Sequence, residues 1–290
     1  MTTRRKRVAI QGIEGSFHDI AARRFFEEEL DFVGCDTFID VFGAVNGGEA
    51  EYGVVAIENS VAGSILPNYS LLRDNRAKII GETYLRISQN LLALPGQSLA
   101  EIHEVRSHPM AIAQTRPYFM RNLPDAVLVE SGDTASSARR IATQKTAGCG
   151  AVGSELAAEL YGLEILARGI ETNKRNYTRF LAVVREEMVE TQDSSNKASL
   201  CFSLPHESGS LSGALSILSF YGIDLTKIQS LPIIGREWQY LFYVDVTYGD
   251  LLRYRQALSA LKPLTKIFEV LGEYRKGEKS FEAVHHESAD

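Results

Sequence analysis

Short apolar runs alternate with segments of helical periodicity over the first two thirds of the chain. Residues 7–11 are an apolar run that ends at Gly12, and residues 16–30 then carry apolar side chains at near-helical spacing behind Ser16, which can cap a helix. Runs of the same two kinds predict strands over 52–57, 86–94, 102–106, 126–129, 150–152 and 177–184, and helices over 109–121, 133–144 and 154–161. Such alternation predicts a largely parallel α/β sheet with helices on both faces.

A polar stretch rich in Ser, Asp and Glu then interrupts the pattern, as a linker does. Beyond it the pattern restarts as a strand, a helix, two strands, a helix and a strand, over 198–204, 210–221, 225–234, 240–248, 251–261 and 265–271. This β-α-β-β-α-β order is typical of a ferredoxin-like domain. We therefore expect a large domain over 1–187, a linker over 188–197, a small domain over 198–275 and a disordered polar tail over 276–290.

Composition and charge narrow the class of protein. The 290 residues include 31 Lys and Arg against 37 Asp and Glu, a net charge of −6, and no basic stripe that would favour nucleic acid as a partner. The chain has no stretch of roughly 18 apolar residues, and its basic start lacks the apolar region of a signal peptide, so no membrane span is expected. Cys35, Cys149 and Cys201 are odd in number and far apart, which fits a reducing cytoplasm.

The polar loops after the predicted strands are the candidates for chemistry, because α/β sheets bind ligands at the carboxyl ends of their strands. The sequence has no P-loop, zincin or serine-hydrolase motif. These loops are 12–18, 58–60 with Gly63 and Ser64, 107–109 with Gln114, 133–135, and 176–180. They offer hydroxyls, amides and one guanidinium, which suit an anionic small molecule. A purely structural interpretation stays open: Ser16, Ser107 and Thr134 could cap helices, and Asn59 could stabilise a turn.

Several of these loops resemble one enzyme family, in the same order along the chain. Thr178, Arg179 and Phe180 resemble the Thr-Arg-Phe signature of prephenate dehydratases. Further matching blocks are Glu58-Asn59-Ser60 with Gly63-Ser64, Ser107-His108-Pro109 with Gln114, and Gly153-Ser154-Glu155 with Tyr161-Gly162-Leu163. The last part of the chain resembles an ACT regulatory domain, where Gly213-Ala214-Leu215 and Gln229-Ser230-Leu231-Pro232 stand in place of Gly-Ala-Leu and Glu-Ser-Arg-Pro.

The resemblance implies a two-lobed catalytic domain, similar to type II periplasmic binding proteins, with the active site between the lobes. It implies conversion of prephenate to phenylpyruvate with loss of water and carbon dioxide, on the route to phenylalanine. Thr178 would be the principal catalytic group, and Arg179 would bind a substrate carboxylate and hold positive potential at the cleft. The other implied positions are Asn59, Ser107 and Gln114 in catalysis, and Phe180, Ser60, Ser16 and Thr134 in substrate binding.

The resemblance also implies an allosteric L-phenylalanine site between the ACT domains of two subunits, in a homodimer or homotetramer. Its residues would be Gly213, Ala214, Leu215, Asp224, Gln229 and Ser230. Three positions of this regulatory part depart from the family: Gln229 and Leu231 replace Glu and Arg, and Asp224 stands where Asn is frequent. An extra carboxylate would repel that of a bound amino acid, so inhibition by phenylalanine is left open.

Elementary chemistry limits what these residues can do. A threonine hydroxyl is a very weak acid, so we expect Thr178 to act as an oriented hydrogen-bond donor, and loss of activity in Thr178→Ala would test this. His18 and His108 lie near the loops, but a structural role is the simpler interpretation of both. The sequence shows no metal-ligand cluster, and we expect no metal or organic cofactor.

Two alternative functions stay open. One is an arogenate dehydratase, which acts on the amino-acid analogue of prephenate, and the other is a non-catalytic small-molecule sensor.

Overall fold

The computed structural model describes residues 4–189 and 194–278. Contacts divide this part of the chain into two compact units. The first unit contains residues up to Ile65 and the segment Thr83–Phe180, and the second contains Leu66–Glu82 and Leu181–Glu278. Residues 190–193 of the predicted linker and residues 279–290 of the predicted tail lie outside the described residues. The predicted domain boundaries stay predictions.

The first sheet has the strand order β2-β1-β3-β11-β5, with β4 beside β3. Its strands are β1 (Lys6–Gln11), β2 (Leu30–Cys35), β3 (Tyr52–Asn59), β4 (Gly63–Ser64), β5 (Ala77–Arg86) and β11 (Tyr177–Arg185). β1 pairs in parallel with both β2 and β3, and α1 (Phe17–Phe26) and α2 (Phe38–Asn46) follow β1 and β2. Val8, Ile10 and Phe180 lie in the apolar cluster that packs against this sheet. β5 and β11 each continue from one compact unit into the other.

The predicted helix over 16–30 is too long, because it contains two elements. α1 ends at Phe26, where Glu27 adopts a left-handed conformation with φ 53, and Leu30 then opens β2. β5 and α2 were also missed, although the Thr37 capping box and Gly47 mark the two ends of α2.

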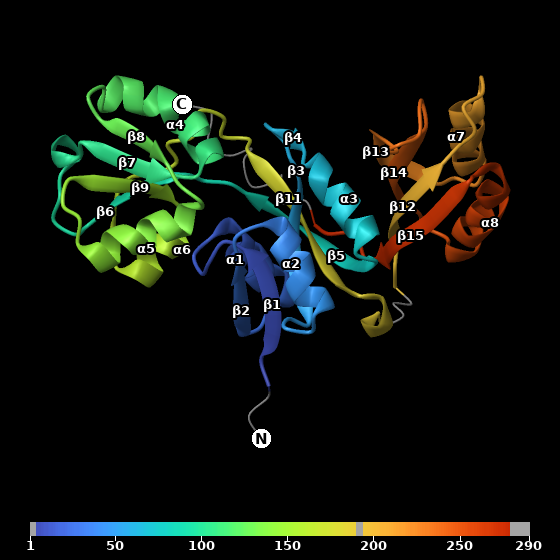
Figure 1. The fold of residues 1–290 in the computed structure, drawn as a ribbon, viewed down its shortest axis with the longest axis horizontal. Coiled ribbons are helices and arrows are strands. Elements are labelled where there is room, and N and C mark those ends of the chain that lie inside the picture. Colours follow the sequence, from blue (N-terminus) through green and yellow to red (C-terminus); the bar gives the residue numbers. More distant parts are fainter. Residues whose placement is uncertain (1–3, 190–193, 279–290) are drawn as a thin grey trace. The chain divides into compact units, whose positions relative to one another are not determined.

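The second sheet has the order β10-β6-β9-β7-β8. Its elements are β6 (Asn90–Ala93), the turn η1 (Leu99–Glu101), β7 (Glu104–Ser107), α4 (Pro109–Asn122), β8 (Val127–Glu130), α5 (Thr134–Gln144), β9 (Cys149–Gly153), α6 (Glu155–Tyr161) and β10 (Glu164–Ala167). β7 pairs in parallel with β8 and β9, whereas β6 pairs antiparallel with β9 and β10. Figure 1 shows α4 on one face of this sheet and α5 and α6 on the other. The expectation of covering helices is correct, and that of a largely parallel sheet fails at β6 and β10.

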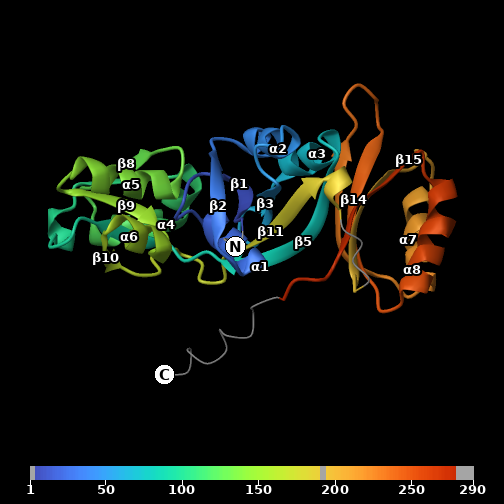
Figure 2. The same ribbon diagram turned by 90° about the horizontal axis from the view of Figure 1, so that it is seen from below.

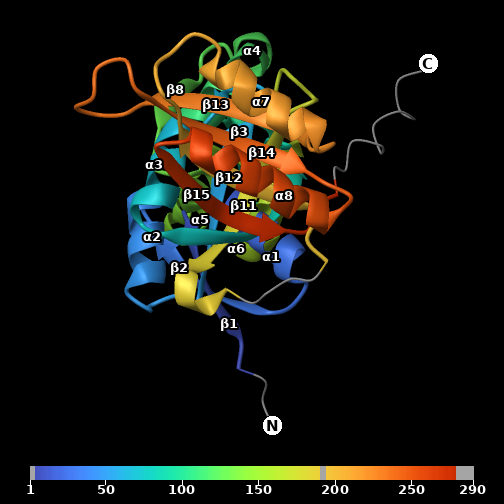
Figure 3. The ribbon, with the colours of Figure 1, turned by 90° about the vertical axis from the view of Figure 1, so that its right-hand side faces the viewer.

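The second unit contains an antiparallel sheet of order β13-β14-β12-β15. Its elements are η2 (Glu186–Met188), β12 (Lys197–Ser203), α7 (Ser210–Phe220), β13 (Asp224–Pro232), β14 (Tyr240–Thr247), α8 (Leu251–Leu261), η3 (Lys262–Leu264) and β15 (Ile267–Tyr274). Figures 2 and 3 both show α7 and α8 on one face of the sheet, where Leu200, Leu218 and Leu258 share one apolar core. The order of elements is the predicted β-α-β-β-α-β.

The opposite face of this sheet is covered by the segment Leu66–Glu82, which includes α3 (Leu66–Asp74). The Tyr69 ring lies 5.2 Å from that of Tyr243, and the Lys197 ammonium pairs with the Glu82 carboxylate at 2.8 Å. Gly272 allows the closest approach, because a Cβ there would lie 2.2 Å from the Ile79 carbonyl oxygen. The segment is therefore integral to the second unit. Within the described residues, no helix has the length and apolar character needed to cross a membrane.

Candidate functional site

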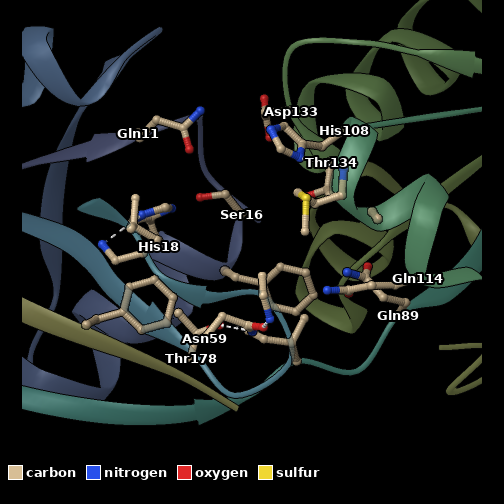
Figure 4. Close-up of a pocket in the computed structure, with 18 of the residues that line it drawn as sticks. Gln11, Ser16, His18, Asn59, Gln89, His108, Gln114, Asp133, Thr134 and Thr178 are labelled. Atoms are coloured by element: carbon tan, nitrogen blue, oxygen red, sulfur yellow. Dashed lines mark hydrogen bonds between the residues drawn. The ribbon is translucent and has the colours of Figure 1, made fainter. Parts of the chain in front are cut away.

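The first unit contains two lobes, one built on the first sheet and one on the second sheet. A cavity of about 360 Å³ in this unit is lined by residues of both lobes. Figure 4 shows Gln11, Ser16 and His18 on one side, and His108, Asp133 and Thr134 on the other. Of the residues predicted for the active site, the lining includes Ser16, Asn59, Gln114, Thr134, Thr178 and Phe180. Residues that are far apart in the sequence thus meet at one cavity.

Thr178 and Asn59 form the centre of a hydrogen-bonded chain of neutral groups. The Asn59 amide nitrogen donates to Thr178 Oγ1 at 2.9 Å and to Asn176 Oδ1 at 2.7 Å. Its carbonyl oxygen accepts from the backbone N–H groups of Val61 and Ala62 at 2.9 and 2.8 Å, which fixes the orientation of the amide. Asn176 in turn donates to Gln114 Oε1 at 2.9 Å. Every member of this chain is therefore held in one orientation.

The local fold explains why Thr178 faces the cavity. Side chains alternate along β11, so Thr178 and Phe180 line the cavity and Arg179 does not. Ser60, at the end of β3, holds the start of β11: its hydroxyl donates to the Arg175 carbonyl at 2.9 Å and accepts from Tyr177 N–H at 2.9 Å. Asn59 and Thr178 are thus brought together by strand pairing at the carboxyl end of β3.

The N-termini of three helices meet at the cavity. In α1, α4 and α5 the capping residue lines it together with at least one residue of the first turn. Ser16 caps α1 by accepting from Asp19 N–H at 3.2 Å, and His108 caps α4 by accepting from Met110 N–H at 3.2 Å. Helix N-termini carry a partial positive charge, so this arrangement favours a bound anion.

The two histidines of the cavity are neutral at physiological pH. Burial, followed by repulsion from His108, lowers the pKa of His18 from 6.5 to about 3. Burial also lowers the pKa of His108, although the nearby carboxylates Asp133 and Glu130 oppose the shift. His18 Nε2 accepts from Ala56 N–H at 3.4 Å and packs edge-on against Phe180 with ring centroids 5.0 Å apart. The structural interpretation of His18 is thus the better supported one.

Three residues predicted for the site lie outside the cavity lining. Ser107 is fully buried at the end of β7, where its hydroxyl donates to the Val152 carbonyl at 2.7 Å and ties β7 to β9. Arg179 is 5 % exposed on the far side of β11, so the structure does not bring its guanidinium to the cavity. Ser60 is an exposed residue whose hydroxyl is engaged by the backbone, as described above.

The structure also adds residues that sequence reasoning missed. Gln11 closes β1, and Gln89 lies beside Gln114 in Figure 4. Gln89 is 3 % exposed, and its Oε1 has no hydrogen-bond partner among the described residues. Asp133 caps α5 by accepting from the N–H groups of Ala135 and Ser136, at 2.7 and 3.1 Å. Asp133 lay in a loop singled out from the sequence, but its neighbour Thr134 was preferred; Gln89 lies within a predicted strand and carried no signal.

The residues predicted for an allosteric site lie on two elements of the second unit. Gly213, Ala214 and Leu215 are on α7, and Asp224, Gln229 and Ser230 are on the edge strand β13. The side chain of Ala214 is fully buried in the core, and Asp224 Oδ2 accepts from Thr247 Oγ1 at 3.4 Å. Gln229 and Ser230 are neighbours on a strand, so their side chains point to opposite faces. The structure therefore does not gather all six side chains on one face.

Neither compact unit offers an obvious metal centre. In residues 4–189 and 194–278, no three His, Cys, Asp or Glu side chains gather as ligands for an ion. The thiols are also inert, because burial raises the pKa of Cys35 and of Cys149 to about 11.

Comparison with known proteins identifies the family. The model of the family "Prephenate dehydratase" matches residues 8–188. A bifunctional chorismate mutase/prephenate dehydratase of Aquifex aeolicus is 36 % identical, over 93 % of this chain and 74 % of that protein, and arogenate dehydratase 5 of Arabidopsis thaliana is 37 % identical, over 92 % and 67 %.

Two solved structures share the fold over nearly the whole chain. GqqA, described as a novel type of quorum quenching acylases, has 31 % identity and a TM-score of 0.83, covering 93 % of this chain and 98 % of that one. The prephenate dehydratase of Arthrobacter aurescens in complex with L-Phe has 26 % identity and a TM-score of 0.79, covering 93 % and 90 %. The family model covers more than half of the chain and the relatives are similar over most of it, and the chain belongs to the prephenate dehydratase family.

Proposed function

We propose that the cavity of the first unit converts prephenate to phenylpyruvate, with release of water and carbon dioxide. The observation that carries this proposal is the bond from Asn59 to Thr178 Oγ1. A hydroxyl has one hydrogen to donate, and no residue in the described part of the chain accepts it from Thr178. The hydroxyl lines the cavity, so a ligand there is its available acceptor.

The reaction requires assistance at two places. The bond between the ring and its carboxylate breaks, its electrons enter the ring, and the opposite C–O bond breaks to release hydroxide, which takes up a proton to become water. Thr178 would donate a hydrogen bond to the departing oxygen, and Asn59 would hold Thr178 in position. Apolar side chains such as Phe17, Ile87 and Phe180 would solvate the departing carboxylate weakly, which favours its loss as neutral carbon dioxide.

The substrate is a dianion, and its charge needs a counterpart. The earlier candidate, Arg179, does not line the cavity. We assign that role instead to the N-termini of α1 and α4, whose caps are neutral and whose dipoles point toward the cavity. Gln114 adds a side-chain amide whose oxygen is already occupied by Asn176, so its nitrogen is oriented to donate.

Substrate assays distinguish this proposal from its rivals. The purified chain would be incubated in parallel with prephenate, with arogenate and with an N-acyl amide. The products measured would be phenylpyruvate from prephenate, phenylalanine from arogenate and the free amine from the N-acyl amide. We expect phenylpyruvate from prephenate together with phenylalanine from arogenate. The acylated amide is included because GqqA is described as an acylase. Release of the amine without either aromatic product would overturn the proposal, and no turnover with saturable binding would favour a sensor.

We further propose that residues 198–275 form an ACT domain that binds L-phenylalanine and regulates residues 1–187. The β-α-β-β-α-β order supports this, as does the likeness to a structure in complex with L-Phe. The proposed organisation also includes the linker over 188–197, a cytoplasmic location and a homodimer or homotetramer. Calorimetric titration of the whole chain with L-phenylalanine tests the regulatory part, because the absence of saturable binding would reject it.

A further inference from the structure

Among the residues the structure describes, Asp133 is the one Asp, Glu, Lys or Arg that lines the cavity. The remaining lining residues are apolar, hydroxyl, amide and thioether side chains together with the two neutral histidines. Asp133 takes part in none of the ion pairs found within residues 4–189 and 194–278. A half-buried carboxylate without a cation therefore faces a cavity that is otherwise suited to an anion.

Capping of α5 does not require this charge. Ser16 caps α1 and Ser154 caps α6 with neutral hydroxyls, and Asn is as good a cap as Asp. The carboxylate also reaches the opposite lobe, since a Cβ added to Gly12 at the end of β1 would lie 3.2 Å from Asp133 Oδ1. A negative charge thus lies where the two lobes approach each other, beside His108 and Thr134 (Figure 4).

This charge has opposite effects on the two substrates that the family suggests. Prephenate carries two carboxylates and a keto group, so Asp133 repels it. Arogenate carries an ammonium group in place of the keto oxygen, and an ammonium at a carboxylate gains both a charge interaction and a hydrogen bond. The N-termini of α1 and α4 and the side-chain amides remain available to the carboxylates of either substrate.

We propose that Asp133 determines substrate specificity, and that its carboxylate binds the ammonium group of arogenate so that the amino-acid substrate is accepted in preference to the keto acid. This inference rests on the proposed dehydratase function. The sequence alone indicated no residue that would distinguish prephenate from arogenate, and the proposal assigns this role to Asp133. Such discrimination combines attraction of one substrate with repulsion of the other.

The test is Asp133→Asn, which removes the charge and keeps a side chain able to cap α5. Values of kcat/KM would be measured for arogenate and for prephenate, with wild type and variant in the same buffer. We expect the ratio of the two values, arogenate over prephenate, to fall at least tenfold, through loss of arogenate turnover and gain of prephenate turnover. Glu130→Gln is the matched control. This substitution removes the same charge as Asp133→Asn, but Glu130 is exposed and does not line the cavity.

The outcomes separate this inference from the function on which it rests. A wild-type enzyme that turns over neither substrate contradicts the dehydratase function itself. A wild-type enzyme that uses prephenate alone, or a ratio that stays within twofold in Asp133→Asn, overturns the role of Asp133 and leaves the dehydratase function intact. An equal fall of the ratio in Glu130→Gln would also overturn it, because the effect would then come from overall charge. Melting temperatures of both variants show whether a loss of activity is a loss of folding.

Discussion

The buried polar groups beneath the sheet of the second unit differ in charge from those bonded to Thr178 at the cavity of the first unit. In the second unit, Lys197 and Glu82 are 2 % and 4 % exposed and pair at 2.8 and 2.9 Å, and Ser199 links Asp245 to Tyr274 at 2.5 and 2.7 Å. At the cavity of the first unit, the chain of bonded groups contains amides and hydroxyls alone.

We interpret the charged groups of the second unit as stabilising the fold, and the neutral groups at the cavity as positioned to bind a ligand. A buried charge is tolerated when a partner satisfies it, as Lys197 satisfies Glu82 beneath the sheet of the second unit. At the cavity, a donor such as the Thr178 hydroxyl is held in place but keeps its hydrogen available. Substitutions in the two regions should therefore differ in kind: those in the second unit should change stability, and those at the cavity should change turnover.

The largest effect is expected at the buried ion pair. Lys197→Met leaves the Glu82 carboxylate buried without its cation, which should lower the free energy of unfolding by roughly 3–5 kcal/mol. Urea denaturation measures it. The double variant Lys197→Met with Glu82→Leu should recover most of the loss, because no unpaired charge remains. A single variant as stable as wild type would show that the pair does not hold the segment Leu66–Glu82 in place.

Removal of the Thr178 hydroxyl should affect turnover instead. Thr178→Val is nearly isosteric, and loss of one preorganised donor typically lowers kcat by roughly 10²–10³. The melting temperature should barely change, and Thr178→Ser should retain part of the activity. Steady-state kinetics with the preferred substrate measures the effect. Near-normal turnover in Thr178→Val would remove Thr178 from the mechanism.

The sequence predicted the chemistry of this cavity better than its geometry. The blocks around Asn59, Gln114 and Thr178 could be recognised because each is a short, local pattern. The direction of a side chain depends on strand register, which is why Arg179, one residue along from Thr178, was wrongly placed at the cleft. Ser107 lies outside the lining because its hydroxyl is bonded to the Val152 carbonyl within the sheet, and its neighbour His108 lines the cavity instead.

The fold shows the same division. The β-α-β-β-α-β order of residues 197–274 followed from periodicity, because its elements are separated by clear turns. The packing of Leu66–Glu82 against that sheet depends on contacts far apart in sequence, such as that of Ile79 with Gly272. No local pattern encodes such contacts, so the second unit extends beyond the predicted small domain.

A smaller effect is expected at Asn176, which bonds Asn59 and Gln114 without itself lining the cavity that contains Thr178. Asn176→Asp can still accept from Asn59 but cannot donate to Gln114. We expect kcat to fall about tenfold, or roughly 1.4 kcal/mol in activation free energy, with a smaller change in KM. Asn173→Asp, an exposed residue of the same loop, is the matched control for added charge. Equal effects of the two variants would contradict a positioning role.

The last effect depends on pH and concerns His18 and the neutral character of the cavity. Its pKa is lowered from 6.5 to about 3, chiefly by burial, so between these values the unfolded chain binds a proton that the folded chain excludes. Stability should therefore fall as the pH falls below 6.5, by about 1.4 kcal/mol per pH unit from this residue. His18→Gln, which keeps an acceptor for Ala56 N–H, should show a slope shallower by one proton. Urea denaturation between pH 6.5 and 5 measures both slopes. Parallel slopes would mean that His18 is protonated in the folded state, and the cavity would then hold a cation beside Phe180 and not a neutral ring.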